Sequence, residues 1–203
     1  MATYLSHFFM GSIPAAAIFA CFLPYRRQSL TARKLRSGPW REVGLYLFVG
    51  YLAGLAAMIL WPGYHFEATD GLWGNLVIHN ARESLLSSMN LVPFRMIADY
   101  FRSFGEGELF YAIVFLIGNV GVFLPLGFFP PLLFRGVSAG KVFAIGLGYS
   151  FCGEFLQFFL GRHCDVDDVI LNILGVMAGY GMYRLLKRTA PGFSRRFHCE
   201  NQN

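Results

Sequence analysis

The chain has 203 residues, of which 55% are hydrophobic, 17% are aromatic and only 14% are charged. An ordinary soluble domain carries about 25% charged residues, so this composition excludes that class and is typical of an integral membrane protein. The net charge of +5 does not require a nucleic-acid partner, because the basic residues fall where a membrane protein places them.

Five apolar segments are long enough, or nearly so, to cross a bilayer as helices, since a hydrocarbon core about 30 Å thick needs about 20 helical residues. They are continuously apolar, whereas the strands of a membrane barrel would alternate. In chain order they are Tyr4–Pro24, Val43–Trp61, Leu109–Phe134, Val142–Leu160 and Val169–Leu186. We therefore predict an all-α integral membrane protein, a bundle of about five transmembrane helices. The spacing of Gly175 and Gly179 indicates close helix packing in the last of them.

The stretch between the second and third segments, residues 62–107, is too mixed to cross the membrane and too apolar to be a free linker. Within it, residues 85–101 mix Leu, Met, Phe and Ile with polar residues. Two interpretations fit this pattern. One is an interfacial helix that breaks at Asn90–Pro93, because the residue before a proline avoids helical geometry. The other is a loop that covers the outer end of the bundle.

Most of the 17 Lys and Arg residues lie in two connections and at the C-terminal end, which we assign to the cytoplasmic side because cytoplasmic loops are enriched in basic residues. They are Arg26, Arg27, Arg33, Lys34, Arg36, Arg41, Arg135, Lys141, Arg184, Lys187, Arg188, Arg195 and Arg196. Most acidic residues fall on the opposite side. We therefore predict a multi-pass protein with its N-terminus outside and its C-terminus in the cytoplasm. Its basic face should contact anionic membrane lipids, and no nucleic-acid partner is expected.

Two stripes of polar residues are predicted near the outer ends of the fourth and fifth segments, because positions three and four apart share one face of a helix. The first stripe is Ser150, Glu154 and Gln157, and the second is Asp165, Asp168 and Asn172. Asn119, on the third segment, should reach a similar depth from the same side. We expect these residues to form one polar site that faces outward.

A charged side chain at the bilayer centre costs about 2.5–3.5 kcal/mol on insertion scales, so Glu154 is a candidate for function. We assign it the role of catalytic acid or base, with Asp165 and Asp168 as further catalytic candidates. The candidates for substrate binding are Arg162, Gln157, Asn119, Asn172 and Ser150. The alternative is that these residues only hold the helices together, through hydrogen bonds worth about 0.6 kcal/mol each.

The connection GRHCDVDD, residues 161–168, adds further polar groups to this site. Arg162 could bind a phosphate or carboxylate in two parallel hydrogen bonds. His163 and the aspartates would suit a divalent cation. Their spacing matches no established ligand motif, so we assign no metal ligand and leave the cofactor unknown. For Asp165 and Asp168 the sequence favours a helix cap at the start of the fifth segment.

Three motifs carry a family resemblance: NLVPF at residues 90–94, GNVGVFLPLGF at 118–128, and the series S-x3-E-x2-Q-x4-R-x2-D-x2-D-x3-N-x2-G from Ser150 to Gly175. In these motifs the chain resembles the VanZ-like family of bacterial membrane proteins. The resemblance implies a bundle of four or five helices in the bacterial inner membrane. For the founding member it also implies a link to low-level resistance to teicoplanin, a glycopeptide that binds cell-wall precursors outside the membrane.

The resemblance extends from about Val43 to Leu186 and suggests three regions. Residues 1–42 would be an additional membrane helix with a basic cytoplasmic loop, residues 43–190 the VanZ-like domain, and residues 191–203 a cytoplasmic tail. Two functions remain open. The protein could bind or chemically process an anionic or lipid-linked envelope molecule, such as an undecaprenyl-linked molecule or a phospholipid. Alternatively, it could be a non-catalytic scaffold or shielding protein.

Overall fold

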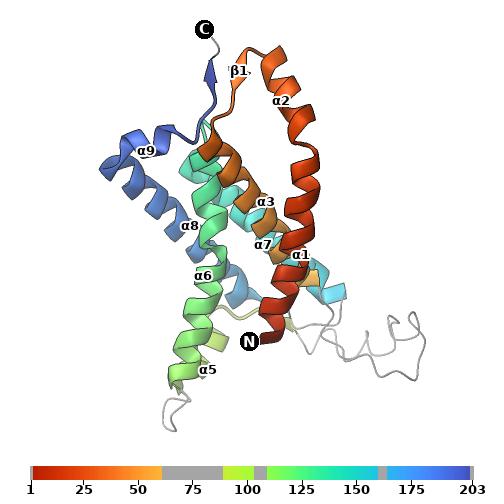
Figure 1. Cartoon of the computed structure of the whole chain (residues 1–203). Coiled ribbons are helices and arrows are strands. Elements are labelled where there is room, and N and C mark those ends of the chain that lie inside the picture. The colour runs from red at the N-terminus through yellow and green to blue at the C-terminus, as the bar shows by residue number, and fades with distance from the viewer. Residues whose placement is uncertain (1, 61–88, 103–108, 160–163, 202–203) are drawn as a thin grey trace, which may run out of the picture.

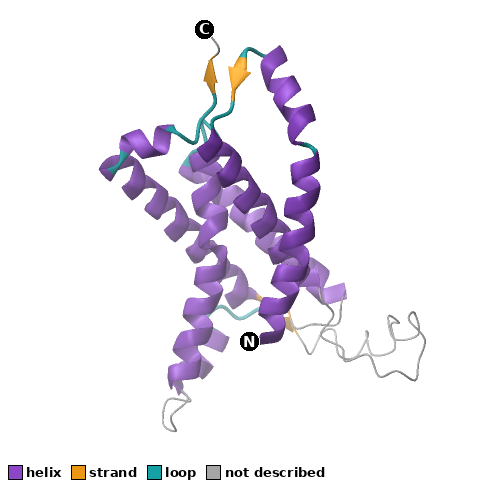
Figure 2. Cartoon of the chain, viewed as in Figure 1, coloured by secondary structure: helices purple, strands orange, loops and turns teal. Residues whose placement is uncertain are grey.

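A computed structural model describes residues 2–60, 89–102, 109–159 and 164–201 of the chain. The helices are α1 (Ala2–Cys21), α2 (Leu23–Ala32), α3 (Pro39–Leu60), α5 (Arg95–Arg102), α6 (Leu109–Leu133), α7 (Ala139–Phe159), α8 (Val166–Thr189) and α9 (Pro191–Arg195). The described strands have two residues each: β1 (Leu35–Arg36), β2 (Met89–Asn90), β3 (Cys164–Asp165) and β4 (Glu200–Asn201). Figure 2 shows these strands as short pieces beside long helices. The predicted all-α class is confirmed.

The five predicted segments correspond to α1, α3, α6, α7 and α8. Over the described residues, three helical stretches are long and apolar enough to cross a membrane: Pro39–Ile59, Leu116–Leu133 and Val166–Thr189. α1 and α2 are bent by 49° relative to each other, and together they would form a fourth span. α7 contains Lys141 and Glu154 and is not among these spans over its described residues. The structure therefore supports a multi-pass membrane protein with three to four candidate spans.

Glycine allows α6 and α8 to approach each other closely. A Cβ atom at Gly175 would collide with the carbonyl oxygen of Val120, and one at Gly179 would collide with that of Leu124. The two helices therefore meet backbone to backbone along this seam, as is common where small residues recur every four positions in membrane helices. The predicted packing role of Gly175 and Gly179 is confirmed.

The apolar core lies where α3, α6, α7 and α8 meet. Its buried members are Tyr51, Leu55, Phe123, Leu126, Val142 and Val176. The hydroxyl group of Tyr51 donates a hydrogen bond of 2.8 Å to the carbonyl oxygen of Val122, so this polar atom is satisfied inside the core. A second buried cluster places Phe197, which follows α9, against residues of α3, α6 and α8. The C-terminal segment is thereby attached to the bundle.

The bundle has two chemically different ends (Figure 1). One end carries α2, α9, the antiparallel pair of β1 with β4, and the C-terminus. We call it the basic end, because most of the Lys and Arg residues lie there. The other end carries α5, the parallel pair of β2 with β3, and the start of α1. We call it the polar-cluster end, after the side chains described below.

The described part of the segment before α6 is a strand, a turn and a short helix. β2 ends at Asn90, and α5 begins at Arg95, two residues after Pro93. The backbone is therefore not helical at Asn90–Pro93, which agrees with the predicted break and its reason. Residues 61–88 lie outside the described residues, so the interfacial position of a longer helix stays a prediction.

The orientation of the bundle is a prediction that cysteine labelling checks. Arg95 and Arg33 are exposed at opposite ends of the bundle. In a variant whose native cysteines are replaced by serine, a membrane-impermeant maleimide should label Arg95→Cys in intact spheroplasts. It should label Arg33→Cys only after lysis, because basic loops stay in the cytoplasm. The reverse pattern would place the polar-cluster end in the cytoplasm.

Candidate functional site

Asp165 caps α8 and also binds the segment before α5. It has the extended backbone of an N-cap residue (φ −128°, ψ 126°), and its carboxylate accepts a hydrogen bond of 2.9 Å from the backbone N–H of Asp167. The side-chain amide of Asn90 donates to both carboxylate oxygens of Asp165, at 3.1 Å each. The predicted cap is confirmed for Asp165, and its second contact connects two segments 75 residues apart.

Asp167 is fully buried, with 0% of its surface exposed. One carboxylate oxygen accepts a hydrogen bond from the backbone N–H of Phe94, and the other accepts one of 3.2 Å from that of Ile97. Phe94 immediately precedes α5 and Ile97 lies in its first turn, where backbone donors lack helical acceptors. Asp167 therefore caps α5 from a different helix.

The bond to Asp167 also explains the backbone of Phe94. Phe94 has a φ of 63°, which is uncommon for a residue other than glycine. Such a conformation persists only where its surroundings hold it in place. The carboxylate of Asp167 supplies that restraint at the start of α5.

Glu154 lies at the centre of the predicted polar stripes. Its side chain is 7% exposed, and one carboxylate oxygen accepts a hydrogen bond of 3.2 Å from the backbone N–H of Asp165. One helical turn earlier, Ser150 accepts a hydrogen bond of 2.9 Å from the side-chain amide of Asn172. Both contacts join α7 to the start of α8, so the predicted meeting of the two stripes is confirmed.

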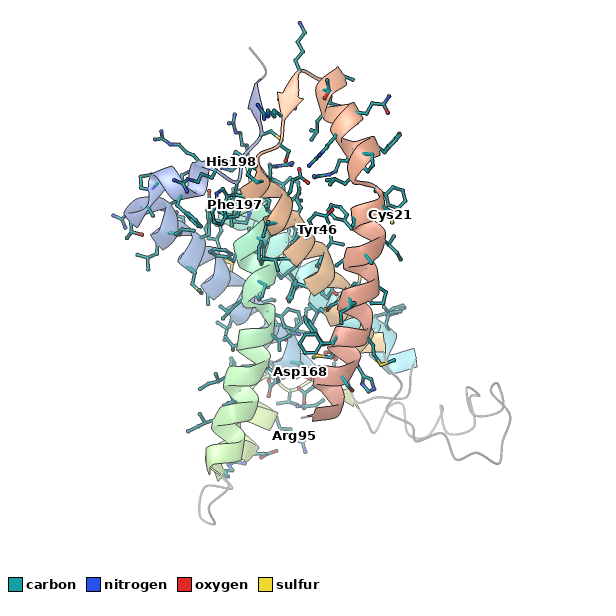
Figure 3. The ribbon with its side chains drawn as sticks, viewed as in Figure 1. Cys21, Tyr46, Arg95, Asp168, Phe197 and His198 are labelled. Carbon is teal, nitrogen blue, oxygen red and sulfur yellow. The ribbon has the colours of Figure 1, made fainter. Side chains whose placement is uncertain are left out.

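The third helix contributes Asn119. Its side-chain amide approaches a carboxylate oxygen of Asp168 at 3.5 Å, which is long for a hydrogen bond. Asn119 is on α6 and Asp168 is in the first turn of α8. Figure 3 shows Asp168 at the polar-cluster end, near Arg95 and far from His198.

Two predicted binding residues cannot be placed. Arg162 lies outside the described residues, and so does its neighbour His163. Gln157 is on α7, but its side chain is not described. Among the residues that the structure describes, no group of three or more His, Cys, Asp or Glu side chains is arranged to hold a metal ion. The described part of the site thus consists of carboxyl, amide and hydroxyl groups.

Sequence reasoning missed Asp167 and Asn90 as members of the site. The helical spacing that selected Asp165 and Asp168 passed over Asp167, which faces another direction. Asn90 entered the sequence analysis only at the predicted helix break and in the NLVPF motif, because a sequence does not show which segment a side chain contacts. The NLVPF motif and the repeated aspartates at residues 165–168 were both visible in the sequence, but only the folded chain shows that they pair.

Four carboxyl groups meet at the polar-cluster end: Glu154, Asp165, Asp167 and Asp168. Each accepts at least one contact from an N–H donor, which reduces the cost of burying a charge. The N-terminus of α8 adds the positive end of its helix dipole beside the three aspartates. The cluster can hold donor-rich groups, whereas an anion would require a cation beside it; among the described residues, Arg95 at the start of α5 is a cation at this end.

Comparison with known families agrees with the motifs. A family model described as VanZ/LLP1 matches residues 48–187, which is more than half of the chain. The chain belongs to the VanZ/LLP1 family. No curated protein and no solved structure matches the chain.

The VanZ/LLP1 match contains the whole polar cluster, from Asn90 to Asn172. It also contains the α6–α8 seam and most of α3. α1, α2 and α9 lie outside the matched residues. The cluster therefore belongs to the part of this chain that defines it as a VanZ/LLP1 protein.

The dual contact of Asp167 predicts a large effect on stability. Asp167→Ala should destabilise the protein by about 1–3 kcal/mol, because it leaves the backbone N–H groups of Phe94 and Ile97, at the start of α5, without their acceptor. Thermal unfolding of the purified protein in detergent measures this loss.

Asp99→Ala is the matched control, because Asp99 is exposed on α5 and its pair with Arg102 spans 3.6 Å at the surface. It should change stability by no more than about 0.5 kcal/mol. Equal unfolding temperatures for the two variants would contradict the capping role of Asp167.

Proposed function

We propose that this VanZ/LLP1 protein binds and chemically processes a lipid-linked or otherwise anionic envelope molecule at the polar-cluster end, with Glu154 as the group that transfers a proton. The molecule would be an undecaprenyl-linked compound or a phospholipid. The site would face the outside of the bacterial inner membrane, as the distribution of basic residues predicts. A role in teicoplanin resistance would follow if the molecule is a cell-wall precursor.

The observation that carries this proposal is the position of the Glu154 carboxylate. It is almost fully buried in a helix of a membrane bundle, and it lies against the backbone of the α7–α8 connection. A protein that needed only a hydrogen-bond acceptor here could use a neutral side chain at lower cost. Retaining an ionisable group supports a role in which a proton is gained and lost.

Recognition of an anion would depend on Arg162. The described carboxyl groups repel a phosphate, so a cation must lie between them and the ligand. Arg162 is three residues before Asp165, which caps α8. From that position its planar guanidinium would offer two parallel hydrogen bonds to a head group.

A second candidate function is supported by a different observation. The hydrogen bonds of three site residues join parts of this chain to one another: those of Asn90, Asp165 and Asp167. Such contacts would equally suit a non-catalytic scaffold or shielding protein whose polar residues only assemble the bundle. The two functions differ in what they require of Glu154.

Glu154→Gln separates the two functions. Glutamine keeps an oxygen that can accept the hydrogen bond from the Asp165 N–H, but it has no ionisable proton. If the site is chemical, Glu154→Gln should abolish teicoplanin resistance in cells that express the protein, while its amount in the membrane stays near that of the wild type. Susceptibility assays and immunoblots of membranes give the two readouts.

Glu154→Leu serves as the comparison, because it removes the acceptor as well and should lower the amount of folded protein. A Glu154→Gln variant with full resistance would exclude the catalytic role and favour the scaffold. If the wild type itself confers no resistance, binding of lipid-linked precursors to the purified protein replaces susceptibility as the readout.

Arg162→Lys tests recognition of an anionic head group. Lysine keeps the charge but lacks the planar fork, so affinity for a lipid-linked pyrophosphate should fall about tenfold with little change in unfolding temperature. Exposed Arg102, on α5, provides the control substitution Arg102→Lys, which should leave affinity unchanged. Wild-type affinity for Arg162→Lys would contradict bidentate recognition.

A further inference from the structure

The basic end contains a large cavity that is separate from the polar cluster. Its volume is about 930 Å³, and it lies between the end of α6, the C-terminal half of α8, and α9 with the residues after it. This volume falls in the range of cavities that hold small molecules or head groups. The polar cluster is at the opposite end of the bundle, as the positions of Asp168 and His198 in Figure 3 show.

Cations dominate the lining of this cavity. They are Arg135, Arg184, Lys187, Arg188 and Arg195, and His198 also lines the cavity. No acidic side chain is among the described residues that line it. None of the five Lys and Arg residues forms an ion pair with another residue in the described part of the chain. Their positive charge is therefore available to an anion that enters the cavity.

The helix dipole of α8 accounts for only part of the positive charge that lines the cavity. Lys187 and Arg188 lie in the last turn of that helix, where cations stabilise the negative end of the helix dipole. Arg135 and Arg195 come from other parts of the chain, after α6 and in α9. Arg135 is held in place, because its guanidinium donates a hydrogen bond of 3.1 Å to the carbonyl oxygen of Cys199.

His198 reports the electrostatic environment of the cavity. Burial lowers the pKa of His198, and the positive charges of Arg135, Lys187 and Arg41 lower it further. Its Nδ1 atom is buried and has no hydrogen-bond partner among the described residues. Burial disfavours any charge, but the contribution of the neighbouring cations shows a positive potential at this place, which attracts an anion.

The cavity lies at the end of a candidate membrane span. α8 is a candidate span up to Thr189, and one face of its last turns lines the cavity. Phe134 and Val137 line the cavity beside the cations, and Phe134 is exposed. An acyl chain can lie along these apolar side chains while its head group reaches the cations.

We propose that this cavity binds the phosphate-bearing head group of an anionic phospholipid, with the guanidinium groups at its rim as ligands of the phosphate oxygens. Arginine suits this role because its fork binds phosphate with two parallel hydrogen bonds. The proposal concerns a second site and does not depend on the function proposed for the polar cluster.

Native mass spectrometry of the full chain with added phosphatidylglycerol tests the proposal. The variant Arg184→Gln/Arg195→Gln removes two cavity cations that are exposed and whose guanidinium groups bond to no other described residue. Its affinity for phosphatidylglycerol should fall at least about tenfold. The control Arg27→Gln/Arg33→Gln removes the same charge from exposed positions outside the cavity and should keep affinity within about twofold.

Three results would overturn the proposal. One is an equal loss of affinity in the two double variants, which would reduce binding to the general charge of the basic end. Another is equal binding of phosphatidylcholine, which carries no net charge. The third is inorganic phosphate that raises the unfolding temperature as much as phosphatidylglycerol does, because the occupant would then be a free anion. Arg184→Lys/Arg195→Lys keeps the charge and should retain part of the affinity.

Discussion

The carboxylate of Asp167 is the contact on which the polar-cluster end depends. A fully buried carboxylate is stable only when its oxygens are occupied, and those of Asp167 bind the backbone N–H groups of Phe94 and Ile97. This requirement fixes the start of α5 against the start of α8. Asn90 is then in position to bind Asp165, whose own N–H binds Glu154.

Backbone contact between α6 and α8 places the other side of the cluster. Because Gly175 and Gly179 carry no Cβ atom, α8 lies close enough to α6 for Asp168 to approach Asn119. α7 packs against the same helix and supplies Ser150 to Asn172. The packing of α6, α7 and α8 along their length thus brings their polar groups together. The same packing sets how deep each group lies in the bundle.

The two ends of the bundle have opposite chemistry. The polar-cluster end gathers carboxyl and amide groups that satisfy one another, whereas the basic end leaves several cations around a cavity. The two ends of the bundle therefore offer chemically different surfaces. The proposed chemistry at Glu154 and the proposed phospholipid site near Arg135 are therefore independent properties of one bundle.

The sequence by itself determined the five long helices α1, α3, α6, α7 and α8 and the faces on which Ser150, Glu154 and Asn172 lie, because these depend on local apolar runs and on a period of 3.6 residues. It also indicated the cap at Asp165, which is a contact between residues two positions apart. Only the tertiary structure decided that Asp167 caps α5 and that Asn90 binds Asp165, since those partners are more than 70 residues apart. The basic cavity likewise required the fold, because Arg135 and His198 meet only when the residues after α9 pack back onto the bundle. The spacing of residues along the chain predicts which face of a helix a side chain occupies. Which residues that face contacts depends on how the helices pack and on where distant segments fold back.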